Sequence, residues 1–357
     1  MLARRDFPAL LLATGLAACA HQRPAGPART APMWPMPPEQ PRYLYEAALR
    51  NAASLGADAS EAPWRRMLTG EGDGAASFSK PTAVAAGRGR VYVSDAEGRQ
   101  VFVFDLARRR VFAFGRRLEG QLRRPAGIAL GPDGRVWVVD GAARSVLIYD
   151  DLGLYLGRID GAGAWSRPTA VAVAPASRKV YVLDTGGVDN DSHRVHVYDA
   201  EGRPQGTLGR RGGAPGEFNL PTDIDVGADG TLWVLDSGNF RVQAFDTEGV
   251  PLRAFGAVGT GLGQLARPRG LTVDRDGLVY VSDATFCNIQ VFTPDGALLL
   301  AIGTRGERDA PGRFLLPAKL AADETGRLYI IDQYFHKVEV VRRLSDDEGR
   351  RLQAQGA

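Results

Sequence analysis

Residues 221–245 contain Pro221-Thr-Asp-Ile-Asp-Val226, Ala228-Asp-Gly230, Leu232-Trp-Val-Leu-Asp236 and Asn239-Phe-Arg-Val-Gln-Ala-Phe245. In order, these are a proline with a short apolar strand, a turn, a strand that ends in aspartate, a polar loop and a strand that ends in an aromatic residue. The same order begins at five other prolines, and the six prolines are 43 to 53 residues apart: Pro81, Pro125, Pro168, Pro268 and Pro317. Repeats of this length are typical of propeller blades. The sequence therefore predicts an all-β, six-bladed β-propeller.

The second strand of each copy is a nearly continuous apolar run, as in Val91-Tyr-Val-Ser-Asp95 and Leu328-Tyr-Ile-Ile-Asp332. Such a run needs burial on both faces, as when one blade packs against the next. The sixth copy ends after its third strand, near Leu344, so ring closure requires a strand from the N-terminal side. We expect Trp64–Gly70 to supply this strand, and Arg42–Leu49 is the alternative.

The first nineteen residues have the pattern of an export signal. The basic pair Arg4-Arg5 precedes a short apolar stretch, Phe7–Leu16, which is too short to span a bilayer. The run Leu16-Ala-Ala-Cys19 resembles a bacterial lipobox, so we expect lipidation at Cys19 and a lipoprotein anchored in the cell envelope. Because Ala20 follows the cysteine, we expect the lipoprotein in the outer membrane, facing the periplasm. Twin-arginine and general export both stay open.

Length and composition favour one large domain behind this leader. The chain has 357 residues, 44% of them hydrophobic, and a formal net charge of +3, which does not call for a nucleic-acid partner. We expect a signal peptide at 1–19, a proline-rich tether and N-terminal segment at 20–60, the propeller with its closing strand at 61–345, and a tail at 346–357. Beyond the lipid site only Cys287 remains, so an intramolecular disulfide is excluded.

The copies resemble NHL repeats, whose pattern is Pro-x-Gly-apolar, then Tyr-Val-x-Asp, then Asn-His-Arg-apolar-Gln. The resemblance covers all six copies and implies a six-bladed propeller. NHL propellers serve as binding platforms for proteins or RNA, as sensor domains and occasionally as enzymes. The fold does not choose among these roles.

Most of the residues that suggest catalysis belong to the repeat itself. The strand-end aspartates recur in every copy, which indicates loop capping. His193 and His336 occupy the histidine position of the NHL pattern, so a three-histidine zinc site is not expected. Similar propellers that act as peptidyl-amidoglycolate lyases have zinc-binding histidines directly after the blade-opening proline, and gluconolactonase-like hydrolases hold a divalent cation with Glu, Asn and Asp. The positions after the prolines offer neither set: Thr82, Ala126, Thr169, Thr222, Arg269 and Ala318.

Exceptions to the repeat are the candidate binding residues. Small residues line the first strands near the axis, but blades four to six carry Asp223, Asp225, Arg269, Thr272 and Lys319. Polar groups near a crowded axis cost free energy unless they are paired. We predict a polar pocket at the channel mouth that binds a small polar or anionic ligand, or a side chain of a partner. The alternative is an internal salt bridge between Asp223 and Lys319 that plugs the channel.

Two further exceptions lie in loops. The loop from Asp184 to Val195 is longer than its counterparts and contains Asp189-Asn-Asp-Ser-His193, which suggests calcium but lacks the glycine and distal glutamate of an EF-hand. We expect a solvated turn there. Residues 108–124 form a basic patch that would meet anionic headgroups or a polyanion, unless its charges only protect an exposed strand: Arg108, Arg109, Arg110, Arg116, Arg117, Arg123 and Arg124.

These observations favour an exported, membrane-anchored propeller that acts as a non-catalytic binding platform. We expect a protein, peptide or envelope polymer as its partner, no nucleic acid, a monomeric state and no cofactor, with a structural divalent cation left open. The alternative function is a hydrolase or lyase that uses acidic residues at the channel mouth, with or without a divalent metal.

Overall fold

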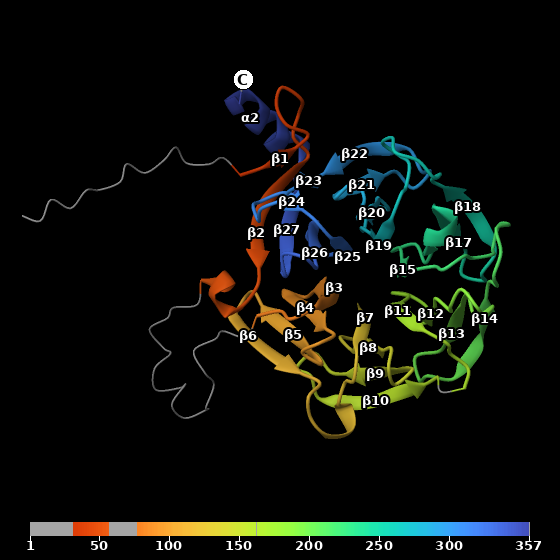
Figure 1. Ribbon diagram of the computed structural model, residues 1–357. Helices are drawn as coiled ribbons and strands as arrows, with labels where there is room; N and C mark the ends of the chain where they lie inside the picture. The colour runs from red at the N-terminus through yellow and green to blue at the C-terminus, as the bar shows by residue number, and fades with distance from the viewer. Residues whose placement is uncertain (1–30, 57–76, 162, 357) are drawn as a thin grey trace, which may run out of the picture. The chain divides into compact units, whose positions relative to one another are not determined.

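The computed structural model describes residues 31–56, 77–161 and 163–356. Six antiparallel sheets surround a central axis as the blades of a propeller, and their strands follow one another from the axis outward (Figure 1). Blades one and two comprise β3 Pro81–Gly87, β4 Arg90–Asp95, β5 Gln100–Asp105 and β6 Arg110–Phe114, then β7 Pro125–Leu130, β8 Val136–Asp140, β9 Ser145–Tyr149 and β10 Tyr155–Asp160. The six-bladed all-β prediction is confirmed.

Blades three to five repeat this arrangement. Blade three comprises β11 Pro168–Val173, β12 Val180–Asp184, β13 Arg194–Tyr198 and β14 Pro204–Leu208. Blade four comprises β15 Asp223–Val226, β16 Leu232–Asp236, β17 Arg241–Phe245 and β18 Pro251–Phe255. Blade five comprises β19 Pro268–Val273, β20 Val279–Asp283, β21 Asn288–Phe292 and β22 Leu298–Ile302, and a short parallel pair, β23 Thr304–Arg305 and β24 Arg313–Phe314, precedes blade six.

Blade six joins the two ends of the propeller sequence. Its strands are β25 Pro317–Ala322, β26 Arg327–Asp332 and β27 Lys337–Arg343, followed by β2 Tyr43–Leu49 and β1 Met33–Trp34. The closing strand is therefore the alternative, and the expectation that Trp64–Gly70 closes the ring is wrong. That segment lies outside the described residues. The closing strand also comes from the range 20–60 and not from 61–345, and an α-helix, α2 Asp346–Gly356, ends the chain.

Contacts of the closing strand show why it fits. Tyr43 is buried, and its hydroxyl lies 2.9 Å from the hydroxyl of Tyr280 in blade five. Glu46 pairs with two arginines of blade six, Arg327 at 2.7 Å and Arg342 at 2.9 Å. The unpaired edge of β27 is thereby covered, which removes a site for aggregation.

The hydrophobic core consists of six clusters, and each lies between two neighbouring blades. The cluster between blades one and two contains Val101, Leu122 and Val138, for example, and the cluster between blades six and one contains Val93 and Ile331. All of these side chains are buried. The prediction that the second strands are buried on both faces is confirmed, because residues of one strand belong to two clusters.

Each blade has two ends, which we call the proline end and the turn end. The opening proline pairs with the strand-end aspartate, as Pro81 does with Asp95, and so both lie at the proline end. Between residues 77 and 343, the proline-end loops are 77–80, 96–99, 115–124, 141–144, 161, 163–167, 185–193, 209–222, 237–240, 256–267, 284–287, 303–316 and 333–336. The turn-end loops are 88–89, 106–109, 131–135, 150–154, 174–179, 199–203, 227–231, 246–250, 274–278, 293–297 and 323–326.

Predictions about the leader fall outside the described residues, which begin at 31. These are the signal peptide, lipidation at Cys19 and the first part of the tether. Among the helices that the structure describes, none is both long and apolar enough to cross a membrane.

Candidate functional site

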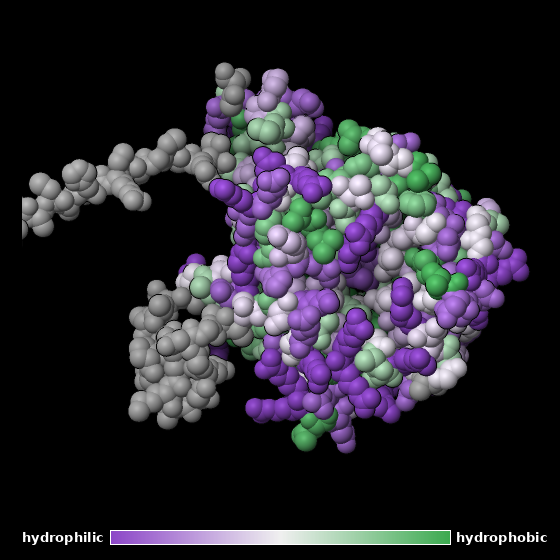
Figure 2. All heavy atoms as spheres, in the orientation of Figure 1, coloured by the Kyte–Doolittle hydropathy of each residue, from purple (hydrophilic) through white to green (hydrophobic). Residues whose placement is uncertain are grey.

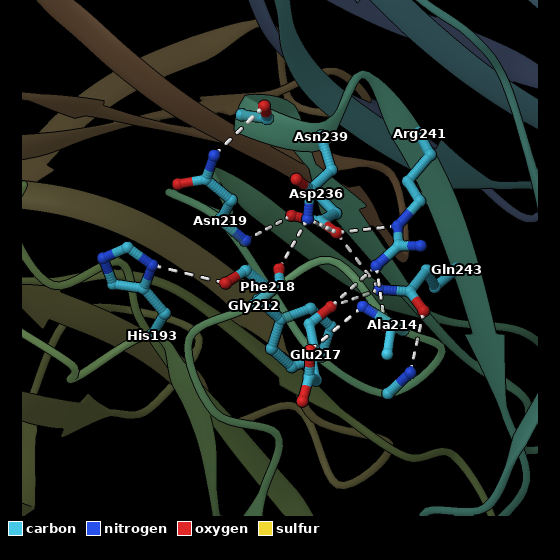
Figure 3. Close-up of polar contacts among 12 residues, drawn as sticks. His193, Gly212, Ala214, Glu217, Phe218, Asn219, Asp236, Asn239, Arg241 and Gln243 are labelled. Carbon is cyan, nitrogen blue, oxygen red and sulfur yellow. Dashed lines mark hydrogen bonds and ion pairs between the residues drawn. The ribbon is translucent and has the colours of Figure 1, made fainter.

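The strand-end aspartates hold the proline-end loops together. In blade four the buried carboxylate of Asp236 accepts hydrogen bonds from the Asn219 backbone N–H (2.7 Å), Asn239 Nδ2 (2.9 Å) and Arg241 Nε (2.8 Å) (Figure 3). The Gln243 amide Nε2 donates to the carbonyl of Glu217 in the same loop, at 2.8 Å. These contacts explain why the pattern Asn-x-Arg-apolar-Gln follows the aspartate. The loop-capping role predicted for this residue type is confirmed here.

Blade six builds the same loop with different chemistry. Lys337 and Glu339 replace the arginine and glutamine, and they form a buried ion pair at 2.5 Å. Lys337 Nζ also donates to the carbonyl of Arg313 at 3.0 Å, and Glu339 accepts the N–H of Gly312. Burial raises the pKa of Glu339 to about 7, although the Lys337 charge opposes the shift. Alignment of the six copies reveals Lys337 and Glu339 as an exception to the repeat, but the contacts of this pair stabilise the fold.

Two carboxylates from β15 lie at the axis and contact blade five. Asp223 accepts a hydrogen bond from the Leu271 backbone N–H at 3.0 Å and forms an ion pair with Lys319 at 2.6 Å. Lys319 Nζ also donates to the carbonyl of Thr169, at 3.1 Å. Burial raises the pKa of Asp223, and the Lys319 charge opposes the shift. The salt bridge that we considered as the alternative to a pocket is therefore present.

Asp225 contacts the same strand of blade five, two residues further along. Its carboxylate accepts hydrogen bonds from Thr272 Oγ1 (2.7 Å), the Val273 backbone N–H (2.9 Å) and the Val226 backbone N–H (2.8 Å). Burial raises the pKa of Asp225 to about 6. The innermost strand of a blade has an unpaired edge, and these carboxylates supply acceptors to the edge of β19. Both aspartates thus join blade four to blade five.

A cavity of about 160 Å³ lies on the axis, lined in part by Asp223, Asp225, Thr272 and Lys319. Its lining comes from residues two to five positions after the opening prolines, so it lies away from the proline end of the channel. Arg269, directly after Pro268, is not part of this lining, and its guanidinium donates to Gln333 Oε1 at 2.9 Å. Burial lowers the pKa of Arg269. Four of the five predicted pocket residues therefore come together, and ligand binding there stays a prediction.

The long loop of blade three turns Asn190 and His193 inward and leaves Asp189 and Asp191 exposed. Asn190 Oδ1 accepts hydrogen bonds from the Gly187 and Ser192 backbone N–H groups, both at 3.1 Å. His193 is buried, and its Nδ1 accepts a hydrogen bond from the Leu220 N–H at 3.2 Å. In the described part of the chain, no three His, Cys, Asp or Glu side chains are grouped so that they could hold a metal ion.

The seven arginines of the predicted basic patch do not form one patch. Strand β6 separates them, because its first residue, Arg110, pairs with Asp105 at the turn end and its last, Phe114, pairs with Val101 at the proline end. All seven are exposed. Three belong to the turn end and four to the proline end: Arg108, Arg109 and Arg110, then Arg116, Arg117, Arg123 and Arg124. The expectation of a single surface is wrong, because nearness in sequence was taken for nearness in space.

The loops at the two ends carry opposite net charge. Proline-end loops hold fourteen Lys and Arg residues, all exposed, against seven Asp and Glu, whereas turn-end loops hold eight Lys and Arg against thirteen Asp and Glu, with buried and exposed side chains counted alike. The six strand-end aspartates lie beneath the proline-end loops, fully buried. The fourteen basic residues are Lys80, Arg99, Arg116, Arg117, Arg123, Arg124, Arg144, Arg167, Arg210, Arg211, Arg267, Arg305, Arg308 and Arg313.

Part of this charge recurs at one position of the blade. In four of the six blades a basic residue immediately precedes the opening proline, and its backbone N–H donates to the strand-end aspartate. These four are Lys80, Arg124, Arg167 and Arg267. The backbone is thereby fixed while the side chain is exposed at the proline end. Sequence reasoning missed this feature, although the recurring basic–proline pairs were its signal.

Comparison with known proteins supports the fold. Residues 218–245 match the family model of the NHL repeat. A search of curated proteins gives no match. Three solved structures share the architecture: a protein of unknown function from Bacteroides thetaiotaomicron (17% identity, TM-score 0.57, 75% of this chain and 70% of that one), a gluconolactonase from Xanthomonas campestris (20%, 0.53, 75% and 87%) and virginiamycin B lyase from Staphylococcus aureus (13%, 0.53, 74% and 96%).

Identities this low establish the shared fold alone. The sheet order, the repeated aspartate network and the matched segment agree on the architecture. The protein is a six-bladed β-propeller that is closed by an N-terminal strand, and its residues 218–245 match the NHL repeat.

Proposed function

We propose that this protein is a non-catalytic binding module that recognises an anionic partner of the cell envelope through its proline end. The observation that carries the proposal is the charge of the proline-end loops, where Lys and Arg outnumber Asp and Glu by two to one. Such a surface attracts negatively charged partners and accelerates their association. The module is exported, anchored through a lipid on Cys19 and monomeric, and it requires no cofactor.

The contacts of the fourteen basic side chains support a binding role. Some are neutralised locally, as Arg210 is by Glu217 at 2.8 Å. Others, such as Arg117, Arg144 and Arg305, have no ion pair with any described residue. Solvated charges of one sign that form no contact within the fold are available to a partner.

The alternative, a hydrolase or lyase at Asp223 and Asp225, has less support. Each carboxylate already accepts hydrogen bonds from β19, and Asp223 also pairs with Lys319. A general base or metal ligand needs a free lone pair directed at its target. Metal analysis of the purified chain tests this alternative, and one divalent ion per chain that is lost on Asp225→Asn substitution would favour the enzyme.

Photo-crosslinking at two exposed valines tests the proposed binding end. Val258 lies in a proline-end loop and Val250 in a turn-end loop, so they form a matched pair. A photoreactive residue at position 258 should give covalent adducts in intact producing cells, and one at position 250 should not. Adducts from position 250 alone would contradict the proposal. Metabolic labelling with a fatty acid, lost on Cys19→Ser substitution, tests the anchor.

A further inference from the structure

We propose that the proline end docks on a membrane surface that contains anionic phospholipid headgroups, with the loop 115–124 as its principal contact. This inference names the partner of the proposed binding surface and therefore rests on the proposed function. Such a membrane presents a flat, negatively charged layer over an apolar interior. Basic side chains bind the phosphates of this layer, and apolar side chains enter the interface.

The loop 115–124 is pinned at both sides of an exposed apolar residue. Leu122 is fully buried, and its backbone N–H donates to the carbonyl of Gly115 at 2.7 Å. The hydroxyl of Tyr149 donates to the carbonyl of Gly120 at 2.6 Å. Between these anchors Leu118 is 90% exposed, directly after Arg116 and Arg117. An apolar side chain is thus held out in solvent by a loop whose base is fixed.

Basic residues also lie at the end of this loop and on the neighbouring blades. The backbone N–H groups of Lys80, Arg124 and Arg167 donate to strand-end aspartates at 3.0, 3.1 and 2.7 Å, so their chain positions are fixed and their side chains are exposed. Arg99 and Arg144 occupy equivalent positions in blades one and two, and both are exposed. The proline-end loops of blades one to three thus hold eight Lys and Arg residues against four Asp and Glu.

Other exposed apolar residues of the proline end lie in three further loops, 185–193, 256–267 and 333–336. In Figure 2, hydrophilic side chains predominate on the face in view, and apolar ones form small separate patches. A protein partner favours a contiguous apolar core within its interface. Separate apolar tips among basic residues fit a fluid surface better, because each tip inserts independently. Besides Leu118, the exposed tips are Val188 (74%), Leu262 (73%), Val258 (64%) and Tyr334 (59%).

Vesicle sedimentation of the full chain tests this inference, with Cys19→Ser in every sample so that no acyl chain contributes. The vesicles are phosphatidylcholine with or without phosphatidylglycerol, and polyphosphate serves as a soluble polyanion. The proline-end variant replaces Arg116, Arg117, Arg123 and Arg124 by Gln. The matched turn-end variant replaces Arg108, Arg109, Arg110 and Arg178 by Gln, which removes the same charge. Circular dichroism confirms that each variant is folded.

We expect salt-sensitive binding to the anionic vesicles and much weaker binding to phosphatidylcholine alone. Each arginine near an anionic surface contributes about fivefold to the binding affinity. The proline-end variant should therefore lose at least about fiftyfold in affinity for the anionic vesicles, and the turn-end variant less than about threefold. Leu118→Ser should weaken vesicle binding about tenfold and leave polyphosphate binding unchanged.

Equal losses in the two charge variants, or no effect of Leu118→Ser, would overturn the lipid inference. Binding to polyphosphate without binding to vesicles would overturn it too, but would leave an anionic partner for the proline end. Binding to neither, with adducts only from position 250 in the crosslinking experiment, would reject both the inference and the proposed function.

Discussion

The proline end and the turn end of this propeller use charged residues in different ways. At the turn end, aspartates such as Asp229 and Asp246 accept backbone hydrogen bonds within tight turns, so the acidic charge there follows from turn chemistry. At the proline end the structural aspartates are buried, and most of the exposed charged residues are Lys and Arg. Turns account for much of the acidity of one end, whereas the fold does not require the basicity of the other. Charge that the fold leaves unexplained is the better guide to function.

The largest expected effect is the loss of a proline-end aspartate. Asp236→Ala removes the acceptor of Asn219, Asn239 and Arg241 and leaves buried donors without a partner, so the free energy of unfolding should fall by about 4–5 kcal/mol. Asp229→Ala, in the turn end of the same blade, loses only contacts with Thr231 and should cost about 1 kcal/mol. Urea denaturation measures both values. Similar decreases in the free energy of unfolding of the two variants would mean that aspartates at the two ends contribute equally to stability.

The axis offers a second test, because Asp223 and Lys319 lie between the two ends. Lys319→Ala leaves a buried carboxylate without its countercharge and should cost about 3 kcal/mol. The double variant Asp223→Ala, Lys319→Ala should cost less than the single one, since no charge is left unpaired. Double-mutant denaturation curves measure the coupling. If the double variant loses as much free energy of unfolding as the two single variants together, the pair is not coupled, and the ligand pocket is again the better interpretation.

Features that recur in every blade could be predicted from the sequence. Segments and contacts that have no counterpart in the other blades could not. Six aligned copies were enough for the blade boundaries, the buried second strands and the loop-capping role of Asp236. Closure was mispredicted because the edge of β27 accepts strands of many sequences, and the choice depends on distant contacts such as Tyr43 with Tyr280 and Glu46 with Arg327. The pairing of Asp225 with Thr272 and the Val273 N–H was invisible for the same reason, since it joins different blades.

A pH dependence should come from Asp225, whose pKa burial raises to about 6. Between pH 4 and 6 the folded protein binds a proton that the unfolded chain has released, so the free energy of unfolding falls as pH rises. A rise of two units corresponds to about 3 kcal/mol, and partial exposure to the cavity reduces this to about 2 kcal/mol. In Asp225→Asn the decrease measured by denaturation at pH 4, 5 and 6 should be smaller by this amount, while Glu339, whose pKa is raised to about 7, keeps its own contribution. An unchanged slope would mean that Asp225 titrates normally.

The smallest expected effect on stability comes from adding a hydrogen bond that blade two lacks at its proline end. The residue after the strand-end aspartate donates to a carbonyl of the next blade in three cases, as Ser237 Oγ does to Pro268 at 3.2 Å, Thr185 Oγ1 to Pro221 at 2.7 Å and Gln333 Nε2 to Pro81 at 2.9 Å. The equivalent residue of blade two is Gly141, which has no side chain to donate to the carbonyl of Pro168 in blade three.

A Cβ on Gly141 would lie 3.5 Å from that carbonyl oxygen, a normal van der Waals contact, so a serine hydroxyl could reach it. Gly141→Ser should therefore raise the free energy of unfolding by about 1 kcal/mol. Gly141→Ala gains only the lower entropy of the unfolded chain, and the difference between the two variants measures the hydrogen bond. Equal thermal stability of the Ser and Ala variants would show that contacts between blades at the proline end do not depend on this position.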